Sequence, residues 1–103
     1  MPITDIISEI DGEVEKIILG YGPMDEDFRF FMHVNNMRLV LISEIMSDRR
    51  DEVKEFLRGR TEDELKELRG SIQDCVEKDV SNGVDEGYIC ASGELLSFLD
   101  GSL

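Results

Sequence analysis

Three side chains in this sequence are of types that bind zinc or act in nucleophilic catalysis: His33, Cys75 and Cys90. Zinc sites usually contain closely spaced ligand pairs, such as two cysteines separated by two residues. Here the spacings are 42 and 15 residues, so we expect no metal site. A catalytic histidine needs a nucleophile or an orienting partner, and no serine or cysteine lies near His33 in sequence. We therefore predict no catalytic residue, unless folding brings partners together around His33.

Two glycine-containing segments partly match known ligand-binding loops. Residues 79–90 have the length of a calcium loop, but Val84 replaces its central glycine and Cys90 replaces its final glutamate. Gly20 and Gly22 follow a predicted strand, as in nucleotide-binding loops, but the third glycine and the following helix are missing. We therefore predict no cofactor. Weak calcium binding by the clustered acids is left open.

The elements that would position these residues are predicted from the spacing of apolar side chains. A short helix is expected over residues 4–10, and the following pair, Asp11 and Gly12, should end it. Apolar residues alternate over 13–21, which predicts a strand. They alternate again over 28–46 on both sides of two asparagines, which suit a tight turn, so we predict a β-hairpin there.

Helical spacing dominates the second half of the chain. One helix is expected from Ser47 to Gly59. A second should begin at Thr61, because Thr61 and Glu64 have the spacing of a capping box, and should run to about residue 78. Residues 88–91 could add a fourth, edge strand, and Ser92 could cap a last short helix.

Together these elements predict one domain of α+β class over residues 1–103. The expected architecture is a small antiparallel sheet of three or four strands, with helices packed on one face. The length is that of a single domain, and 41% of the residues are hydrophobic, which is enough for a core without a metal or disulfides.

The strongly acidic composition excludes several kinds of partner. The chain has 24 acidic and 11 basic residues, for a formal net charge of −13. Direct nucleic-acid binding and attachment to anionic membranes both need a basic surface, so neither is expected. We also expect a cytoplasmic protein, because its start lacks the basic segment and long apolar run of a secretion signal, and two cysteines are too few for a disulfide framework.

The acids are concentrated near the two ends of the chain, and this asymmetry is the basis of the functional hypothesis. Residues 1–28 contain eight acids and one base, whereas residues 79–103 contain five acids and no base. A basic surface on a protein partner is the natural complement. Phe31 is expected to add a partly exposed aromatic side chain. The predicted partner-binding residues are Asp11, Glu13, Glu15, Asp25, Glu26, Asp27, Phe31, Asp85 and Glu86.

We therefore expect a small, non-enzymatic binding or regulatory protein that docks a basic protein surface. A sharper version of this hypothesis is an inhibitor that imitates nucleic acid. One alternative is a self-associating structural domain, a homo-oligomer that is acidic only for solubility. Another is a subunit of an enzyme whose site is completed by a different chain.

Overall fold

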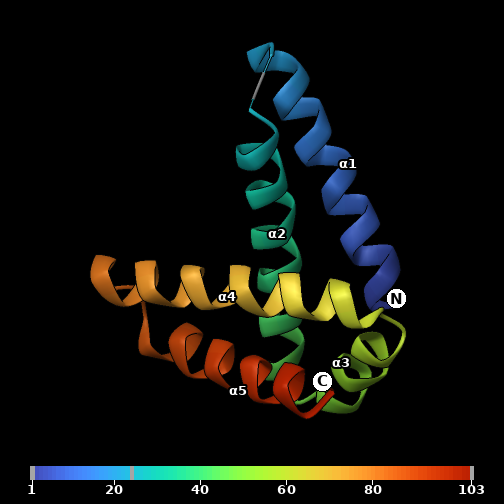
Figure 1. The fold of residues 1–103 in the computed structure, drawn as a ribbon, viewed down its shortest axis with the longest axis vertical. Coiled ribbons are helices and arrows are strands. Elements are labelled where there is room, and N and C mark those ends of the chain that lie inside the picture. Colours follow the sequence, from blue (N-terminus) through green and yellow to red (C-terminus); the bar gives the residue numbers. More distant parts are fainter. Residues whose placement is uncertain (1, 24, 103) are drawn as a thin grey trace.

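The computed structural model describes residues 2–23 and 25–102, and they form helices throughout (Figure 1). About 87% of the chain is helical, and the described residues contain no strand. The predicted α+β class, with its small antiparallel sheet, is therefore wrong, and the protein is all-α. The helices are α1 (Ile3–Tyr21), α2 (Glu26–Met46), α3 (Arg50–Arg58), α4 (Glu62–Asn82) and α5 (Glu86–Ser102).

The strand predicted over residues 13–21 is the second half of α1, which continues through Gly12. A glycine inside a helix costs only about 1 kcal/mol relative to alanine, and buried apolar side chains on both sides of it offset that cost. Ile3, Ile7, Val14 and Ile18 are the buried residues of α1. Their spacings of four and seven residues place them on one helical face, whereas a strand would have buried alternate residues.

The β-hairpin predicted over residues 28–46 is also wrong, because this segment is the single helix α2. Phe28 and Phe30, which start the apparent alternation, are both exposed. The buried residues Val34, Leu41 and Ile45 recur with the period of a helix. Apolar residues are so frequent in this segment that they satisfy a period of two and a period of 3.6 at once, so local spacing does not decide between them.

The second half of the chain agrees better with its local signals. Thr61 is the N-cap of α4: its hydroxyl oxygen accepts a hydrogen bond from the backbone N–H of Glu64 at 3.2 Å, which confirms the predicted helix start. Gly83, in the left-handed conformation that favours glycine, ends α4 at Asn82, four residues later than predicted. Residues 88–91 are not an edge strand but belong to α5, which starts before Ser92.

The helices form two antiparallel pairs that cross (Figure 1). α1 and α2 run side by side as a long hairpin, and α4 and α5 form a second pair that lies across the lower part of α2. The short helix α3 lies close to the start of α1. The main core lies where these elements meet, with Leu41, Leu57, Ile72 and Leu95 fully buried. Among the described residues, no helix is long and apolar enough to cross a membrane.

Candidate functional site

The part of the molecule that extends beyond the crossing helices is the end of the α1–α2 hairpin (Figure 1). We call residues 11–33 the outer hairpin. The base consists of α3, α4, α5, the segments that join them and the part of α2 from Val34 onward. Ile3 and Ile7, near the start of α1, belong to the main core. Val14 and Ile18 are buried but lie outside that core cluster. The outer hairpin is therefore held together mainly by its own two helices.

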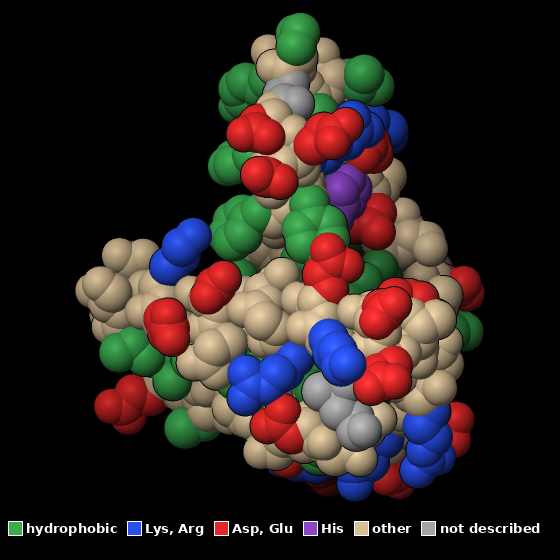
Figure 2. Space-filling view, in the orientation of Figure 1, with side chains coloured by type: hydrophobic (Ala, Val, Ile, Leu, Met, Phe, Trp, Pro, Cys, Tyr) green, Lys and Arg blue, Asp and Glu red, His purple; other side chains and the backbone are tan. Residues whose placement is uncertain are grey.

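Five large apolar side chains are exposed around the outer hairpin. Leu19 and Tyr21, at the end of α1, keep 78% and 79% of their surface accessible. Apolar side chains gather at the top of the space-filling view in Figure 2. Five other large apolar side chains are exposed on the base, but those of the outer hairpin lie on one protruding element and include the two most exposed of all, Leu19 and Tyr21, which makes this element suited to binding. We call this group the tip patch; its members are Ile17, Leu19, Tyr21, Phe28 and Phe30.

Sequence reasoning missed the tip patch because it assigned these residues to covered strand faces. A signal was available: Tyr21 and Phe28 flank a turn that contains Pro23 and an acidic run. A turn is normally at the surface, so apolar residues beside it could have been considered exposed.

Acidic residues surround the tip patch where α2 begins. Asp25 is the N-cap of α2, and its Oδ1 accepts a hydrogen bond from the backbone N–H of Asp27 at 3.0 Å. Glu26 and Asp27 occupy the first turn, where the positive end of the helix dipole favours acids. Glu13, on α1, is exposed and pairs with Lys16. The structure thus gathers three predicted acids, Asp25 to Asp27, around the N-terminus of α2.

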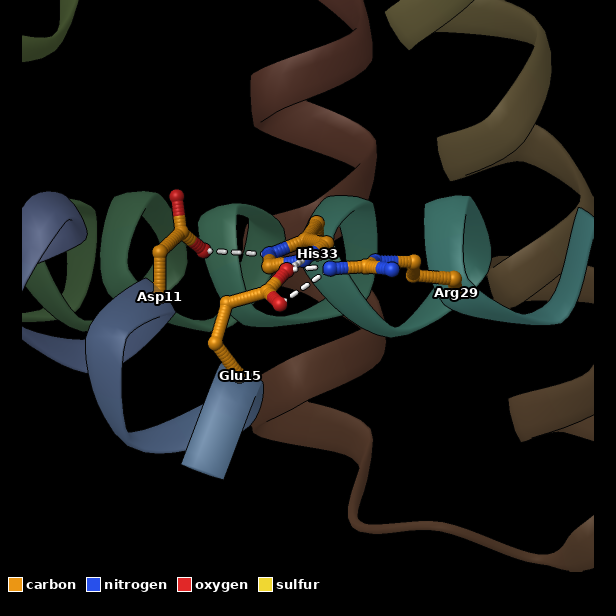
Figure 3. A network of polar contacts seen from close by, with 4 residues as sticks. All are labelled: Asp11, Glu15, Arg29 and His33. Atoms are coloured by element: carbon orange, nitrogen blue, oxygen red, sulfur yellow. Dashed lines mark hydrogen bonds and ion pairs between the residues drawn. The ribbon is translucent and has the colours of Figure 1, made fainter. Parts of the chain in front are cut away.

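Two other predicted acids, Asp11 and Glu15, face α2 and form a charge cluster with Arg29 and His33 (Figure 3). The His33 Nδ1 atom lies 3.0 Å from Asp11 Oδ1, and its Nε2 atom lies 2.8 Å from Glu15 Oε1. Arg29 Nε donates to Glu15 Oε1 at 3.2 Å, and its terminal nitrogen pairs with the other Glu15 oxygen. Each pair of residues is four positions apart on its helix, so both members lie on one face.

This environment favours the charged form of His33. The hydrogen bond to Asp11 is the main cause that raises the pKa of His33 above its ordinary value of 6.5. Partial burial lowers this pKa, and the hydrogen bond to Glu15 raises it. Reciprocally, His33 first and Arg29 second lower the pKa of Glu15 below 4.5. A general base needs a free nitrogen lone pair. Because both ring nitrogens face carboxylates, this arrangement suits an ion pair rather than proton abstraction.

The remaining predicted site residues lie elsewhere or are covered. Asp85 and Glu86 lie at the start of α5, where neighbouring Gly87 lines the same surface pocket as Met46 at the C-terminal end of α2. Asp25 to Asp27 lie at the opposite end of that helix, which is about 30 Å long at 1.5 Å per residue. The structure therefore does not bring the acids from the two ends of the chain into one surface.

Phe31 is half-buried, which agrees with the partly exposed aromatic side chain predicted from the sequence. The Lys78 ammonium of α4 lies over its ring, 4.7 Å from the centroid, and the ring of Phe28 is 6.5 Å away. The lysine thus uses a cation–π contact to link the outer hairpin to the base. Phe31 marks the boundary between the two regions.

Metal-ligating side chains are not concentrated anywhere in the described part of the chain: no group of three or more histidine, cysteine, aspartate or glutamate residues could hold an ion there. Both cysteines are unpaired; Cys75 is buried and Cys90 is exposed. Burial raises the pKa of the Cys75 thiol, which reduces its reactivity.

Comparison with known proteins does not assign this arrangement to a family. No family model matches the chain. No match was found among curated proteins or among solved structures. The function must therefore be argued from the geometry of the outer hairpin.

Proposed function

We propose that this chain is a non-enzymatic binding protein that uses its outer hairpin to dock a protein partner with an apolar surface edged by basic residues. The observation that carries this proposal is the tip patch, which leaves five large apolar side chains exposed on one protruding element. Burying them on a partner would supply a hydrophobic driving force. The unpaired cysteines are compatible with the reducing cytoplasm as its location.

Charge argues for a basic partner rather than a second copy of the chain. Residues 11–33, the outer hairpin, contain six acids, two bases and the single histidine. Two such surfaces would repel each other, whereas a basic rim would be attracted and guided into contact. Imitation of nucleic acid is a weaker version of the proposal, because apolar side chains lie among the acids at this end of the molecule.

The proposal is tested by placing a photoreactive phenylalanine analogue at Tyr21 in the native host and identifying the cross-linked protein. The matched control is the same analogue at Val80, an exposed apolar residue of the base. A partner adduct at Tyr21 but not at Val80 is expected. An adduct of the chain with itself would instead support the self-associating alternative and contradict a basic partner.

The charge of the interface is tested with the purified partner and two matched double variants. Glu26→Lys with Asp27→Lys reverses two acids in the first turn of α2, and Glu62→Lys with Asp63→Lys does the same in α4. Affinity should fall about tenfold or more for the first variant, with about twofold change for the second. Wild-type affinity should also fall with salt. Equal effects of both variants, or no salt dependence, would contradict the proposal.

A further inference from the structure

We propose that the charge cluster of Asp11, Glu15, Arg29 and His33 is a pH-dependent latch, which holds the outer part of α1 against α2 and thereby regulates the tip patch. This inference rests on the proposed function for its biological consequence. The latch itself is a property of the isolated chain and can be tested without a partner.

Apart from the charge cluster, few buried side chains hold the outer part of α1 against α2. The start of α1 is anchored by Ile3 and Ile7 in the main core, and it lies beside α3. Further along, α1 packs on α2 through Val14 and Ile18, which lie outside that core. The charge cluster joins the two helices at this level through contacts of His33 with Glu15 and Asp11, which are 18 and 22 residues away in sequence. Polar contacts therefore have a larger share in holding the outer hairpin than in holding the base.

The geometry requires a proton on each ring nitrogen of His33, because each nitrogen faces a carboxylate oxygen. With both N–H groups present, His33 donates to Asp11 and to Glu15 at once. Neutral imidazole has one N–H, so one nitrogen lone pair would face a carboxylate oxygen. The cluster of two acids and two bases would then have a net negative charge. Loss of this proton thus removes one of the two positive charges that α2 contributes to the cluster and one of the hydrogen bonds that hold α1, so the attraction between the helices weakens and rests on the Arg29–Glu15 pair.

The groups around His33 set the direction in which the latch responds to pH. The charged groups that face His33 are Asp11 and Glu15 on α1, with Arg29 beside it on α2. On α4, Lys78 lies over the ring of Phe31, two positions before His33 in α2. Because the pKa of His33 is raised from 6.5, the latch is fully present below 6.5 and is lost as pH rises through the higher folded value. The lowered pKa of Glu15 keeps it ionised at the acidic end of this range.

The latch makes a prediction opposite to simple charge attraction. Raising the pH adds negative charge to the outer hairpin, which by itself would strengthen binding to a basic partner. Release of α1 would instead shift Ile17 and Tyr21 on α1 relative to Phe28 and Phe30 on α2 and weaken the interface. The sign of the pH effect therefore distinguishes the two causes.

The experiment is an NMR titration of the single histidine combined with amide hydrogen exchange on the isolated chain. The pKa of His33 is expected above 6.5, and in Asp11→Asn it should fall toward that ordinary value. Exchange of amides in residues 11–21, corrected for the intrinsic effect of pH, should become about threefold faster across the His33 titration. Amides in α4 should show no such change.

Two variants separate the latch from general destabilisation. In His33→Gln, the amides of residues 11–21 should exchange rapidly at every pH. Glu9→Gln, which neutralises an exposed acid of α1, should respond to pH like the wild type. A His33 pKa at or below 6.5, or protection of α1 that is independent of pH in the wild type, would overturn the latch. Neither result depends on a partner, so failure of the latch leaves the proposed function to its own cross-linking test.

Discussion

The outer hairpin and the base use their polar and apolar residues in different ways. The base contains the main apolar core, although five large apolar side chains are exposed on it as well. It also buries charge, since Arg38 is nearly inaccessible and its guanidinium donates to Asp79 at 2.7 Å and to the Ser92 hydroxyl at 3.2 Å. The outer hairpin exposes large apolar side chains and leaves its charge cluster partly in water. The difference indicates that the base provides most of the stability, which is compatible with the binding role proposed for the outer hairpin.

The largest expected effect comes from truncating matched leucines in the two regions. Leu41, in α2 of the base, is fully buried, whereas Leu19, in α1, is 78% exposed. Leu41→Ala should lower the free energy of unfolding by about 3 kcal/mol through lost burial and a residual cavity. Leu19→Ala should change it by less than about 0.5 kcal/mol. Denaturant titrations measure both, and similar losses would mean that the tip patch is covered in solution.

Breaking matched ion pairs should produce the next largest difference. Asp79→Asn leaves the buried Arg38 without its charged partner and should lower the free energy of unfolding by about 2 kcal/mol. Lys16→Gln removes an exposed pair with Glu13 and should have no measurable effect. The comparison uses urea titrations at one ionic strength. An Asp79→Asn variant as stable as the wild type would show that the buried pair makes no net contribution.

A smaller effect is expected from the two helix caps. Thr61→Ala removes the N-cap of α4 and should lower the free energy of unfolding by about 1 kcal/mol, because α4 unfolds with the core. Asp25→Ala removes the N-cap of α2 at the outer hairpin. Its effect should appear as faster amide exchange in the first turn of α2, with less than about 0.5 kcal/mol of global change. A larger global loss for Asp25→Ala would mean that the two regions unfold as one unit.

The smallest expected effect is the pH dependence that His33 gives to global unfolding. The contribution of His33 is present below 6.5 and is lost as pH rises through its raised pKa. Glu15 acts at the other end: its contribution is present above 4.5 and is lost as pH falls through its lowered pKa. The difference between wild type and His33→Gln, from urea titrations across this range, should be less than about 1 kcal/mol. A difference that grows with rising pH would contradict the assigned sign.

The parts of the fold that could be predicted from the sequence are those with strong signals in neighbouring residues. Thr61 and Glu64 marked the start of α4 because a cap is made within one helical turn. Gly59 marked the end of the helix before it. The segments 13–21 and 28–46 had no comparable signal, and their apolar residues fit two periods, so the strands assigned there were wrong.

The candidate site divides in the same way between local and long-range information. The excess of acids is visible in the sequence, and it is the reason why neither nucleic acid nor an anionic membrane is expected as a partner. The partners of His33 are not visible, because Asp11 and Glu15 are 22 and 18 residues away and meet it only when α1 folds back on α2. The exposure of the tip patch also depends on where α4 and α5 cross α2.

The sequence by itself thus determined composition, net charge and the cap of α4. Tertiary structure decided that α1 and α2 are helices, that they extend beyond the base, and which of their apolar side chains are buried. The physical reason is that charge and capping depend on single residues and their near neighbours, whereas burial depends on the packing of distant segments. In α2 that packing selected the helical face of Val34, Leu41 and Ile45 for the core and left Phe28 and Phe30 in solvent.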